Sequence, residues 1–274
     1  MSQVVLITGC SMGIGRDLAQ RLSGSAYDVV ATARKTETLD EVPAALKLSL
    51  DVTQPDSVDE AVECTLQRFG RIDVLVNNAG YALRGAVEEV AVEQMQKMFD
   101  VNVFGVLRMI RAVAPHMRQQ GAGRIINISS IAGRLATPVN GAYSATKFAV
   151  EALSDALRWE LAPFGIQVVL IQPGSIKTHF LDTAQAHTQA IFSDPASPYQ
   201  TLYRQSEQAT AGRARQAPGP EAVSRVIQQA LKAPRPKARY LVAVDLPGRL
   251  VLHLGGSVWD LVVRQMFKIG PAAE

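Results

Sequence analysis

The sequence has 274 residues and lacks several features that would point to particular classes of protein. It holds only two cysteines, Cys10 and Cys64, with no CxxC pair and no cluster at metal-ligand spacing, which argues against a disulfide framework or a metal centre. The four histidines are scattered, and the formal charge of +3 is too small to indicate a nucleic-acid-binding protein. We therefore expect a cytoplasmic protein that needs no metal.

Long hydrophobic runs are also missing. The chain passes from Met1 almost directly into VVLITG, which predicts a first strand rather than a signal peptide. No uninterrupted apolar run reaches the roughly 18 residues that a membrane-spanning helix needs. The apolar stretch 250–263 is broken by Gly255, Gly256 and Asp260. We expect it to pack against the domain or a sister subunit, and peripheral membrane contact stays open.

What the sequence does have is a regular alternation of two patterns. Apolar, β-branched runs typical of buried strands alternate with longer segments of helical periodicity, which favours a parallel sheet covered by helices on both faces. We predict a doubly wound α/β fold in one domain over residues 1–274. The predicted strands are residues 4–8, 29–32, 46–50, 74–76, 124–128, 168–171 and 240–244, and the predicted helices are 14–22, 57–69, 92–117, 142–161 and 221–231.

Residues 177–220 break this alternation, because they are polar and weakly periodic. Long irregular excursions in compact domains often act as lids or binding loops, so we predict a substrate-binding lid here, with disorder as the alternative. Residues 240–274 are treated as a C-terminal extension.

A glycine cluster, TGCSMGIG at residues 8–15, lies between the first predicted strand and the first predicted helix. Glycines allow a sharp turn and a close approach of the backbone to a ligand. The start of the helix offers unpaired N–H groups and the positive end of its dipole to a pyrophosphate. At this position in an alternating fold, the cluster predicts a dinucleotide site.

The end of the second predicted strand bears on the choice between NAD and NADP. An acidic residue there would bind the ribose 2′-hydroxyl, and a basic one would bind a 2′-phosphate. The sequence has Ala33, Arg34 and Lys35 there and no acid. We favour NADP(H), with Arg34 pairing with the phosphate, and NAD(H) as the alternative.

Several separated motifs together resemble the classical short-chain dehydrogenase/reductase family. They run in family order over about the first 180 residues: TGCSMGIG at 8–15, Asp51-Val52, NNAG at 77–80, Asn102 in VNVFG, Ser130 in NISS, Tyr143 with Lys147, and Pro173-Gly174 with Thr178. The resemblance implies a Rossmann-type domain with a seven-stranded parallel sheet. It also implies that these residues bind the cofactor: Gly9, Ser11, Met12, Gly13, Ile14, Gly15, Arg34, Asp51, Val52, Asn78, Ala79, Gly80, Asn102, Tyr143, Lys147, Pro173, Gly174, Ile176 and Thr178.

Tyr143 and Lys147 lie one helical turn apart on a predicted helix, so their side chains can meet. Free tyrosine has a pKa near 10, and a neighbouring ammonium lowers that pKa by favouring the phenolate. We predict that Tyr143 is the general acid in carbonyl reduction and the general base in alcohol oxidation, with Lys147 adjusting its pKa.

Two further residues complete a predicted catalytic set of Asn102, Ser130, Tyr143 and Lys147. Ser130 would hydrogen-bond the substrate oxygen, and its family spacing to Tyr143 favours it over Ser129. By the resemblance, Asn102 interrupts its helix and holds a water that links Lys147 to solvent, while Lys147 also holds the nicotinamide ribose.

The substrate and the assembly are less defined. Phe180, Leu181, Ile191, Phe192, Tyr199, Leu202, Tyr203, Tyr81, Leu83, Arg84 and Leu135 could form walls of a pocket for a lipophilic alcohol or carbonyl compound, or only anchor the loop to the core. The resemblance implies a homodimer or homotetramer through the helices at 92–117 and 142–161. A non-catalytic dinucleotide sensor and an epimerase-like relative remain as other functions.

Overall fold

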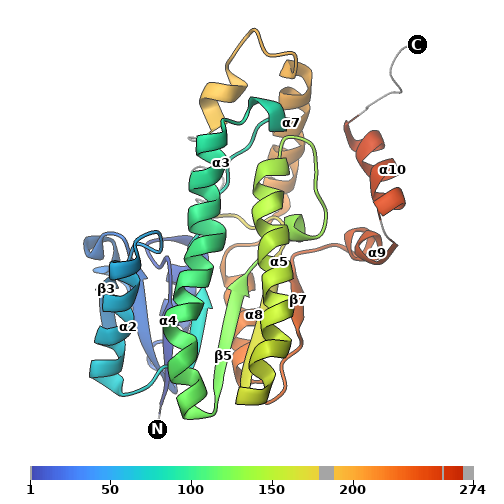
Figure 1. Cartoon of the computed structure of the whole chain (residues 1–274). Coiled ribbons are helices and arrows are strands. Elements are labelled where there is room, and N and C mark those ends of the chain that lie inside the picture. Colours follow the sequence, from blue (N-terminus) through green and yellow to red (C-terminus); the bar gives the residue numbers. More distant parts are fainter. Residues whose placement is uncertain (1, 179–187, 255, 268–274) are drawn as a thin grey trace.

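The computed structural model describes residues 2–178, 188–254 and 256–267. Strands and helices alternate along the chain, as Figure 1 shows. The strands are β1 (Gln3–Ile7), β2 (Tyr27–Ala33), β3 (Leu46–Ser49), β4 (Val74–Asn77), β5 (Gly123–Ile128), β6 (Ile166–Pro173) and β7 (Arg239–Val242). The helices are α1 (Gly13–Leu22), α2 (Pro55–Phe69), α3 (Val92–Phe99), α4 (Gly105–Gln120), α5 (Gly141–Leu161), α7 (Gln200–Gln216), α8 (Glu221–Lys232), α9 (Leu246–Leu254) and α10 (Gly256–Phe267).

The strands form one parallel sheet in the order β3-β2-β1-β4-β5-β6-β7. The order reverses between β1 and β4, and in such sheets ligands bind beyond the carboxyl ends of the strands at this reversal. The predicted doubly wound fold with seven parallel strands is therefore confirmed, and each predicted strand and helix overlaps an observed one.

Alternating side chains of the buried strands pack on two helical layers. Val5 and Ile7 of β1 face a cluster formed with α1 and α8, whereas Val4 and Leu6 face a cluster formed with α2, α4 and α5. Because side chains alternate along a strand and both faces are covered, the strands read as continuous apolar runs. Figure 1 shows α2, α4 and α5 together on the near side of the sheet.

The segment predicted as one helix over 92–117 is interrupted. A π-helical turn at Asp100–Phe104 separates α3 from α4. Asn102 sits in this turn, and its amide is bonded to the Tyr81 backbone in the loop after β4: Oδ1 accepts from Tyr81 N at 3.0 Å and Nδ2 donates to Tyr81 O at 2.8 Å. The widened turn thus ties the helix to the carboxyl edge of the sheet.

The region predicted as an irregular lid is largely helical where it is described. Residues 188–192 form a short helix and α7 follows, so the expectation of a loop is wrong for this part. Residues 179–187, with the predicted wall residues Phe180 and Leu181, lie outside the described residues. In the C-terminal extension α9 and α10 lie to one side of the body (Figure 1), and no helix in the described part of the chain has the length and apolarity to span a bilayer.

Candidate active site

The glycine cluster forms the predicted turn between β1 and α1. Gly9 and Gly13 have φ angles of +74° and +62°, which favour glycine. A Cβ atom on Gly15 would lie 2.6 Å from Asn78 Nδ2 and would also collide with the Gly9 carbonyl oxygen. Asn78 Nδ2 donates to Thr8 O at 2.9 Å and to Gly9 O at 3.0 Å. The NNAG segment therefore holds the turn in place, and the turn requires its glycines.

The first turn of α1 offers unpaired backbone donors. Met12 is its N-cap and makes no side-chain capping bond, and the first turn carries no acidic residue. Ser11, Met12, Gly13 and Ile14 all line one cavity. Free N–H groups, a positive helix end and a close glycine backbone fit the pyrophosphate of a dinucleotide.

This cavity has a volume of about 800 Å³ and extends along the carboxyl edge of the sheet. It brings together predicted residues from most of the chain, and only Gly15 and Asn102 of the predicted set do not line it. The predicted residues on its wall are Gly9, Ser11, Met12, Gly13, Ile14, Arg34, Asp51, Val52, Asn78, Ala79, Gly80, Ser130, Tyr143, Lys147, Pro173, Gly174, Ile176 and Thr178.

The end of β2 carries an exposed cation at the cavity. Arg34 follows Ala33, and among the described residues its side chain forms no ion pair. Asp51, which also lines the cavity, uses its carboxylate locally, accepting from Thr53 N at 2.9 Å and Thr53 Oγ1 at 2.8 Å. The two charged side chains directly after β2, Arg34 and Lys35, are thus both basic.

Tyr143 lies at the start of α5, is only 8% exposed, and hydrogen-bonds with Ser130. Ser130 follows β5, accepts from Ala132 N at 3.1 Å and donates to Pro173 O at 3.4 Å. The neighbouring Ser129 hydroxyl is buried and has no hydrogen-bond partner among the described residues. The spacing argument for Ser130 over Ser129 therefore agrees with the geometry around Tyr143.

Lys147 lies one turn after Tyr143 and is buried with it. Its Nζ donates to Ile128 O at 2.8 Å and lies 5.8 Å from the centre of the Tyr143 ring. Burial lowers the pKa of Lys147 to about 8, and the Glu151 carboxylate opposes this shift. An ammonium with a pKa near 8 can exchange protons close to neutral pH.

We expected neighbouring groups to lower the pKa of Tyr143, but the groups of this chain do not lower it. Burial raises the pKa of Tyr143 above its usual value, and the Ser130 hydrogen bond only partly opposes this. The physical reason is that desolvation disfavours the phenolate, while Lys147 points its ammonium to a backbone carbonyl rather than to the hydroxyl. Tyr143 is therefore protonated at neutral pH, the state that a proton donor requires.

Asn102 is fully buried beside this group. Besides its two bonds to Tyr81, its Nδ2 donates to Thr146 Oγ1 at 3.2 Å, so both amide hydrogens are used. A Cβ atom on Gly80 would lie 3.0 Å from Asn102 Oδ1 and 3.9 Å from Lys147 Nζ. Gly80 thus leaves a small space between the two side chains.

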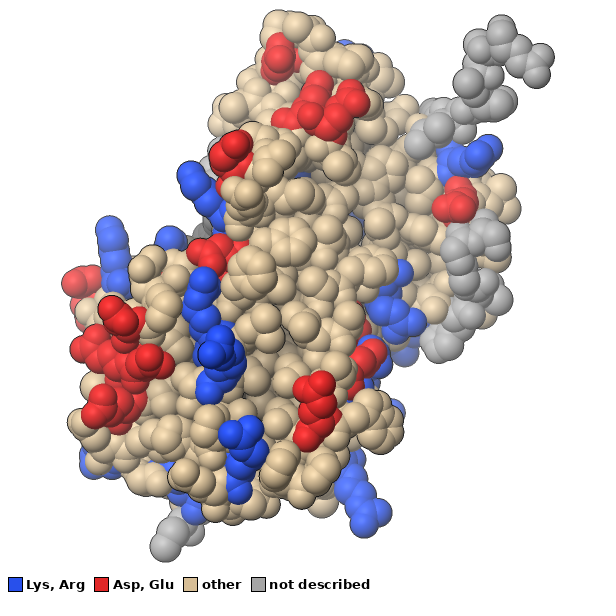
Figure 2. All heavy atoms as spheres, in the orientation of Figure 1, with Lys and Arg blue, Asp and Glu red and all other residues tan. Residues whose placement is uncertain are grey.

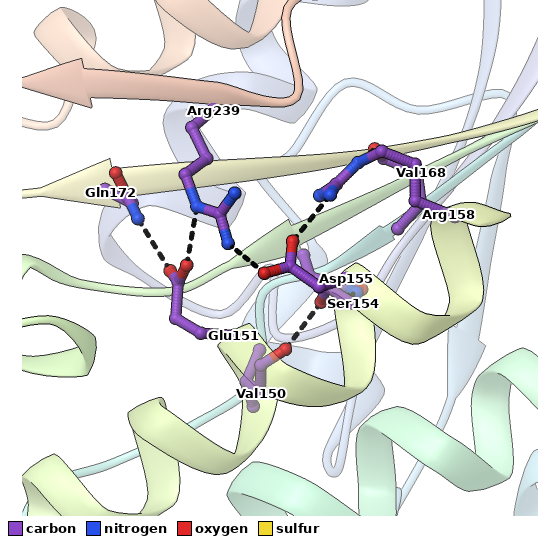
Figure 3. Close-up of polar contacts among 9 residues, drawn as sticks. Val150, Glu151, Ser154, Asp155, Arg158, Val168, Gln172 and Arg239 are labelled. Carbon is purple, nitrogen blue, oxygen red and sulfur yellow. Dashed lines mark hydrogen bonds and ion pairs between the residues drawn. The ribbon is translucent and has the colours of Figure 1, made fainter.

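A partly buried polar network fixes the far side of α5 (Figure 3). Glu151, one turn after Lys147, accepts from Gln172 Nε2 and from Arg239 Nε, both at 2.9 Å. Arg239 also bonds Asp155 at 2.5 Å, and Asp155 bonds Arg158 at the same distance. The network ties α5 to β6 and β7 and holds a carboxylate near the Lys147 ammonium.

The other wall of the cavity follows β6. Gly174 N donates to Val242 O at 2.8 Å, and a Cβ atom there would collide with the Ala243 carbonyl oxygen. The Thr178 side chain lies within van der Waals range of the position that a Gly13 Cβ would take, at 3.7 Å. The segment from Pro173 to Thr178 thus faces the glycine turn across the cavity.

The predicted apolar walls are mostly elsewhere. Ile191, Phe192, Tyr199, Leu202 and Tyr203 pack with Ala86 and Val139, and the Phe192 and Tyr203 rings stack at 4.4 Å, so they anchor α7 instead of lining the cavity. Leu83 is buried and, like Leu135, is not a lining residue, while Tyr81 and Arg84 are. Lining residues that the sequence reasoning missed include Thr137, Asn140, Ser206, Thr210, Arg213 and Phe267.

Comparison with known proteins identifies the architecture. The family model for short chain dehydrogenases matches residues 3–189. The chain belongs to the short-chain dehydrogenase family. A 3-ketodihydrosphingosine reductase of Bacteroides thetaiotaomicron is 46% identical over 180 residues, which is 66% of each chain. Human 17-beta-hydroxysteroid dehydrogenase type 1 is 35% identical over 298 residues, covering 98% of this chain and 87% of the relative.

Solved short-chain dehydrogenase structures have the same fold. One from Streptomyces avermitilis has a TM-score of 0.81 and 34% identity, covering 97% of this chain and 95% of that chain. One from Burkholderia phymatum in complex with NAD has a TM-score of 0.75 and 25% identity, covering 100% and 97%. A metagenomic one in complex with NADP has a TM-score of 0.69 and 27% identity, covering 88% and 97%. This short-chain dehydrogenase is thus an NAD(P)-dependent oxidoreductase acting on CH–OH groups.

No group of three or more side chains within residues 2–178, 188–254 and 256–267 is arranged to hold a metal ion. The donor set at the cavity instead consists of backbone N–H groups, hydroxyls and cations. It fits a nicotinamide dinucleotide, as argued above from the glycine turn and from α1.

Proposed function

We propose that this short-chain dehydrogenase is an NADP(H)-dependent carbonyl reductase, interconverting a ketone or aldehyde with its alcohol. The observation that carries the proposal is the placement of the Tyr143 hydroxyl, bonded with Ser130 and beside Lys147, in the cavity that also contains the glycine turn. The names of two relatives, a ketodihydrosphingosine reductase and a hydroxysteroid dehydrogenase, support a substrate with a substantial apolar part.

The residues divide the work as follows. When bound, the nicotinamide cofactor supplies the hydride that reaches the carbonyl carbon. Ser130 donates a hydrogen bond to the carbonyl oxygen, and Tyr143 gives that oxygen its proton. The phenolate left on Tyr143 is stabilised by the Lys147 ammonium nearby. In alcohol oxidation the proton moves back to Tyr143.

The protonation states suit Tyr143 as the proton donor in carbonyl reduction. Burial keeps the Tyr143 hydroxyl protonated at neutral pH, so it is ready to donate. Lys147, with a pKa of about 8, can then return the lost proton to Tyr143. Asn102 holds the loop at Tyr81, and we propose that a water beside Lys147 completes this relay.

Arg34 is proposed to select NADP(H) by pairing with its 2′-phosphate. NAD(H) remains the alternative, because one structural neighbour is a complex with NAD and Met12, at the glycine turn, adds no second cation. The remaining predicted cofactor residues take the roles that the resemblance gives them: Asp51 and Val52 lie by the adenine, and the Ile176 backbone and Thr178 hold the carboxamide.

We further propose that the protein forms a homodimer or homotetramer through α4 and α5. Phe104, Phe148, Trp159 and Phe164, at or beside these helices, are between 43% and 77% exposed. Figure 2 shows that the surface over α5 is mostly free of charged side chains. Sedimentation equilibrium with Phe148→Asp checks this. The cytoplasmic location and the lid function of 177–220 stay predictions.

A panel of ketones and aldehydes, assayed for net oxidation of NADPH and NADH, tests the function. We expect NADPH oxidation coupled to alcohol formation, with a higher kcat/KM than for NADH. A protein that binds NADPH but oxidises it with no carbonyl compound would instead support the dinucleotide sensor.

A further inference from the structure

Two arginines from distant parts of the sequence meet at the cavity. Arg84 follows β4, Arg213 lies near the end of α7, and both line the cavity that contains Tyr143. Neither forms an ion pair with any described residue, although Asp100 on the same wall pairs with Arg108 at 2.7 Å. The cavity therefore carries two positive charges that no bonded carboxylate neutralises.

Arg84 is held in a fixed position. Its Nη2 bonds the Ser206 hydroxyl and donates to Thr210 Oγ1 at 3.1 Å, and its guanidinium lies 5.6 Å from the centre of the Phe192 ring. All of these partners are neutral. Such contacts fix the orientation of a guanidinium but leave its charge uncompensated.

Without a bound anion, the charge on Arg84 is electrostatically unfavourable. Burial lowers the pKa of Arg84, and the charge of Arg213 lowers it further, while only Glu207 on α7 raises it. Two guanidinium groups that repel each other beside a cavity are typical of a site that receives an anion.

Neutral polar side chains also line the cavity. Thr137, Asn140, Ser206 and Thr210 add hydroxyl and amide groups, and Ala209 and Ala214 are small. The large apolar side chains of this region are packed between α7 and the loop after β4 instead. A purely hydrophobic substrate would leave the charges of both arginines without a counter-charge.

We propose that the substrate carries a carboxylate at a distance from its carbonyl group, bound by Arg84 and Arg213. This inference rests on the proposed function, since it defines the substrate of the same site. It narrows the substrate class from lipophilic carbonyl compounds to amphipathic oxo acids, with the reacting carbonyl at Tyr143 and the anionic end at α7.

The site of the 2′-phosphate does not account for these arginines. Arg34 follows β2, which lies next to the edge strand β3. Arg84 follows β4 and is hydrogen-bonded to Thr210 on α7, and Ala86, two residues later, packs against α7. The two cation groups therefore serve different parts of the bound molecules.

The test compares (ω−1)-oxo carboxylates of several chain lengths with their methyl esters, in the presence of NADPH. We expect kcat/KM to be about tenfold higher for the best acid than for its ester, because a charge-assisted pair contributes more than a neutral hydrogen bond. Arg213→Gln is expected to remove this preference by raising the KM for the acid. Arg215→Gln, on α7 but outside the cavity wall, is the matched control.

Binding supplies a readout that does not depend on turnover. Calorimetry with a saturated fatty acid and with the corresponding alcohol, at saturating NADPH, is expected to show tighter binding of the acid, weakened in Arg213→Gln and by added salt. If the acid binds in this way but no carbonyl compound is reduced, the proposed function fails and the anion site stands. Equal kcat/KM and equal binding of acid and neutral partner would overturn the inference.

Discussion

Glu151 lies one helical turn after Lys147 on α5, and both side chains are buried, at 5% and 6% exposure. The Glu151 carboxylate raises the pKa of Lys147, opposing the lowering caused by burial. Figure 3 shows why the carboxylate stays in place: Gln172 and Arg239 each bond one of its oxygens. The network on the far side of the helix thus acts on the ammonium beside Tyr143.

This relationship predicts a change in the pH profile of Glu151→Gln. If the reaction needs the Lys147 ammonium, carbonyl reduction falls as the pH rises through about 8 in the wild type. Removing the carboxylate removes the effect that raises the pKa, so the alkaline limb of kcat/KM moves to lower pH.

Asp155→Asn is the matched control, because Asp155 contacts the same Arg239 but is not among the groups that shift the pKa of Lys147. Its alkaline limb is expected to match that of the wild type. Superimposable profiles for Glu151→Gln and the wild type would contradict the link between Glu151 and Lys147.

The lowered pKa of Lys147 should also make the folding stability depend on pH. Burial lowers the pKa of Lys147 from 10.5 to about 8, so between these pH values the unfolded chain binds more protons than the folded one. The contribution of Lys147 to stability therefore rises with pH across this window, and below pH 8 the buried ammonium has a constant cost.

In Lys147→Met this dependence disappears. The free energy of unfolding of the variant, relative to the wild type, should fall between pH 7 and pH 10.5 by an amount on the order of 3 kcal/mol. Urea denaturation at several pH values measures this, with exposed Lys35→Met as the control. A difference that is independent of pH would show that Lys147 is not titrating at a lowered pKa.

Cofactor choice depends on Arg34 in this account. Arg34→Gln should raise the KM for NADPH by about tenfold and leave the KM for NADH nearly unchanged, because only NADPH loses a charge-assisted pair. Lys35→Gln, next in the sequence but not on the cavity wall, should change neither constant. An equal loss with both cofactors would mean that Arg34 contacts a part that they share.

The sheet, the glycine turn and the residues around Tyr143 could be predicted from the sequence, because all three depend on local patterns. Strand periodicity and one-turn spacing are local, so Val4 to Ile7, or Tyr143 and Lys147, specify their arrangement within a few residues. The requirement for Gly15 also follows from a turn that the neighbouring residues define.

Properties that depend on distant packing were not accessible in this way. The pKa of Tyr143 rises because surrounding elements remove water, which spacing along α5 does not reveal. Arg84 and Arg213 lie on different elements, and they are close together only because α7 packs near the loop after β4. The polarity of Thr210 and Arg213 was visible in the sequence, but only the fold places them at the cavity.

The most direct test of proton transfer by Tyr143 is the rate of NADPH oxidation by Tyr143→Phe, measured with a ketone that the wild type reduces. We predict that kcat falls by roughly 10²- to 10⁴-fold, since a positioned proton donor contributes this much, while the variant still binds NADPH. A kcat equal to that of the wild type would contradict the account.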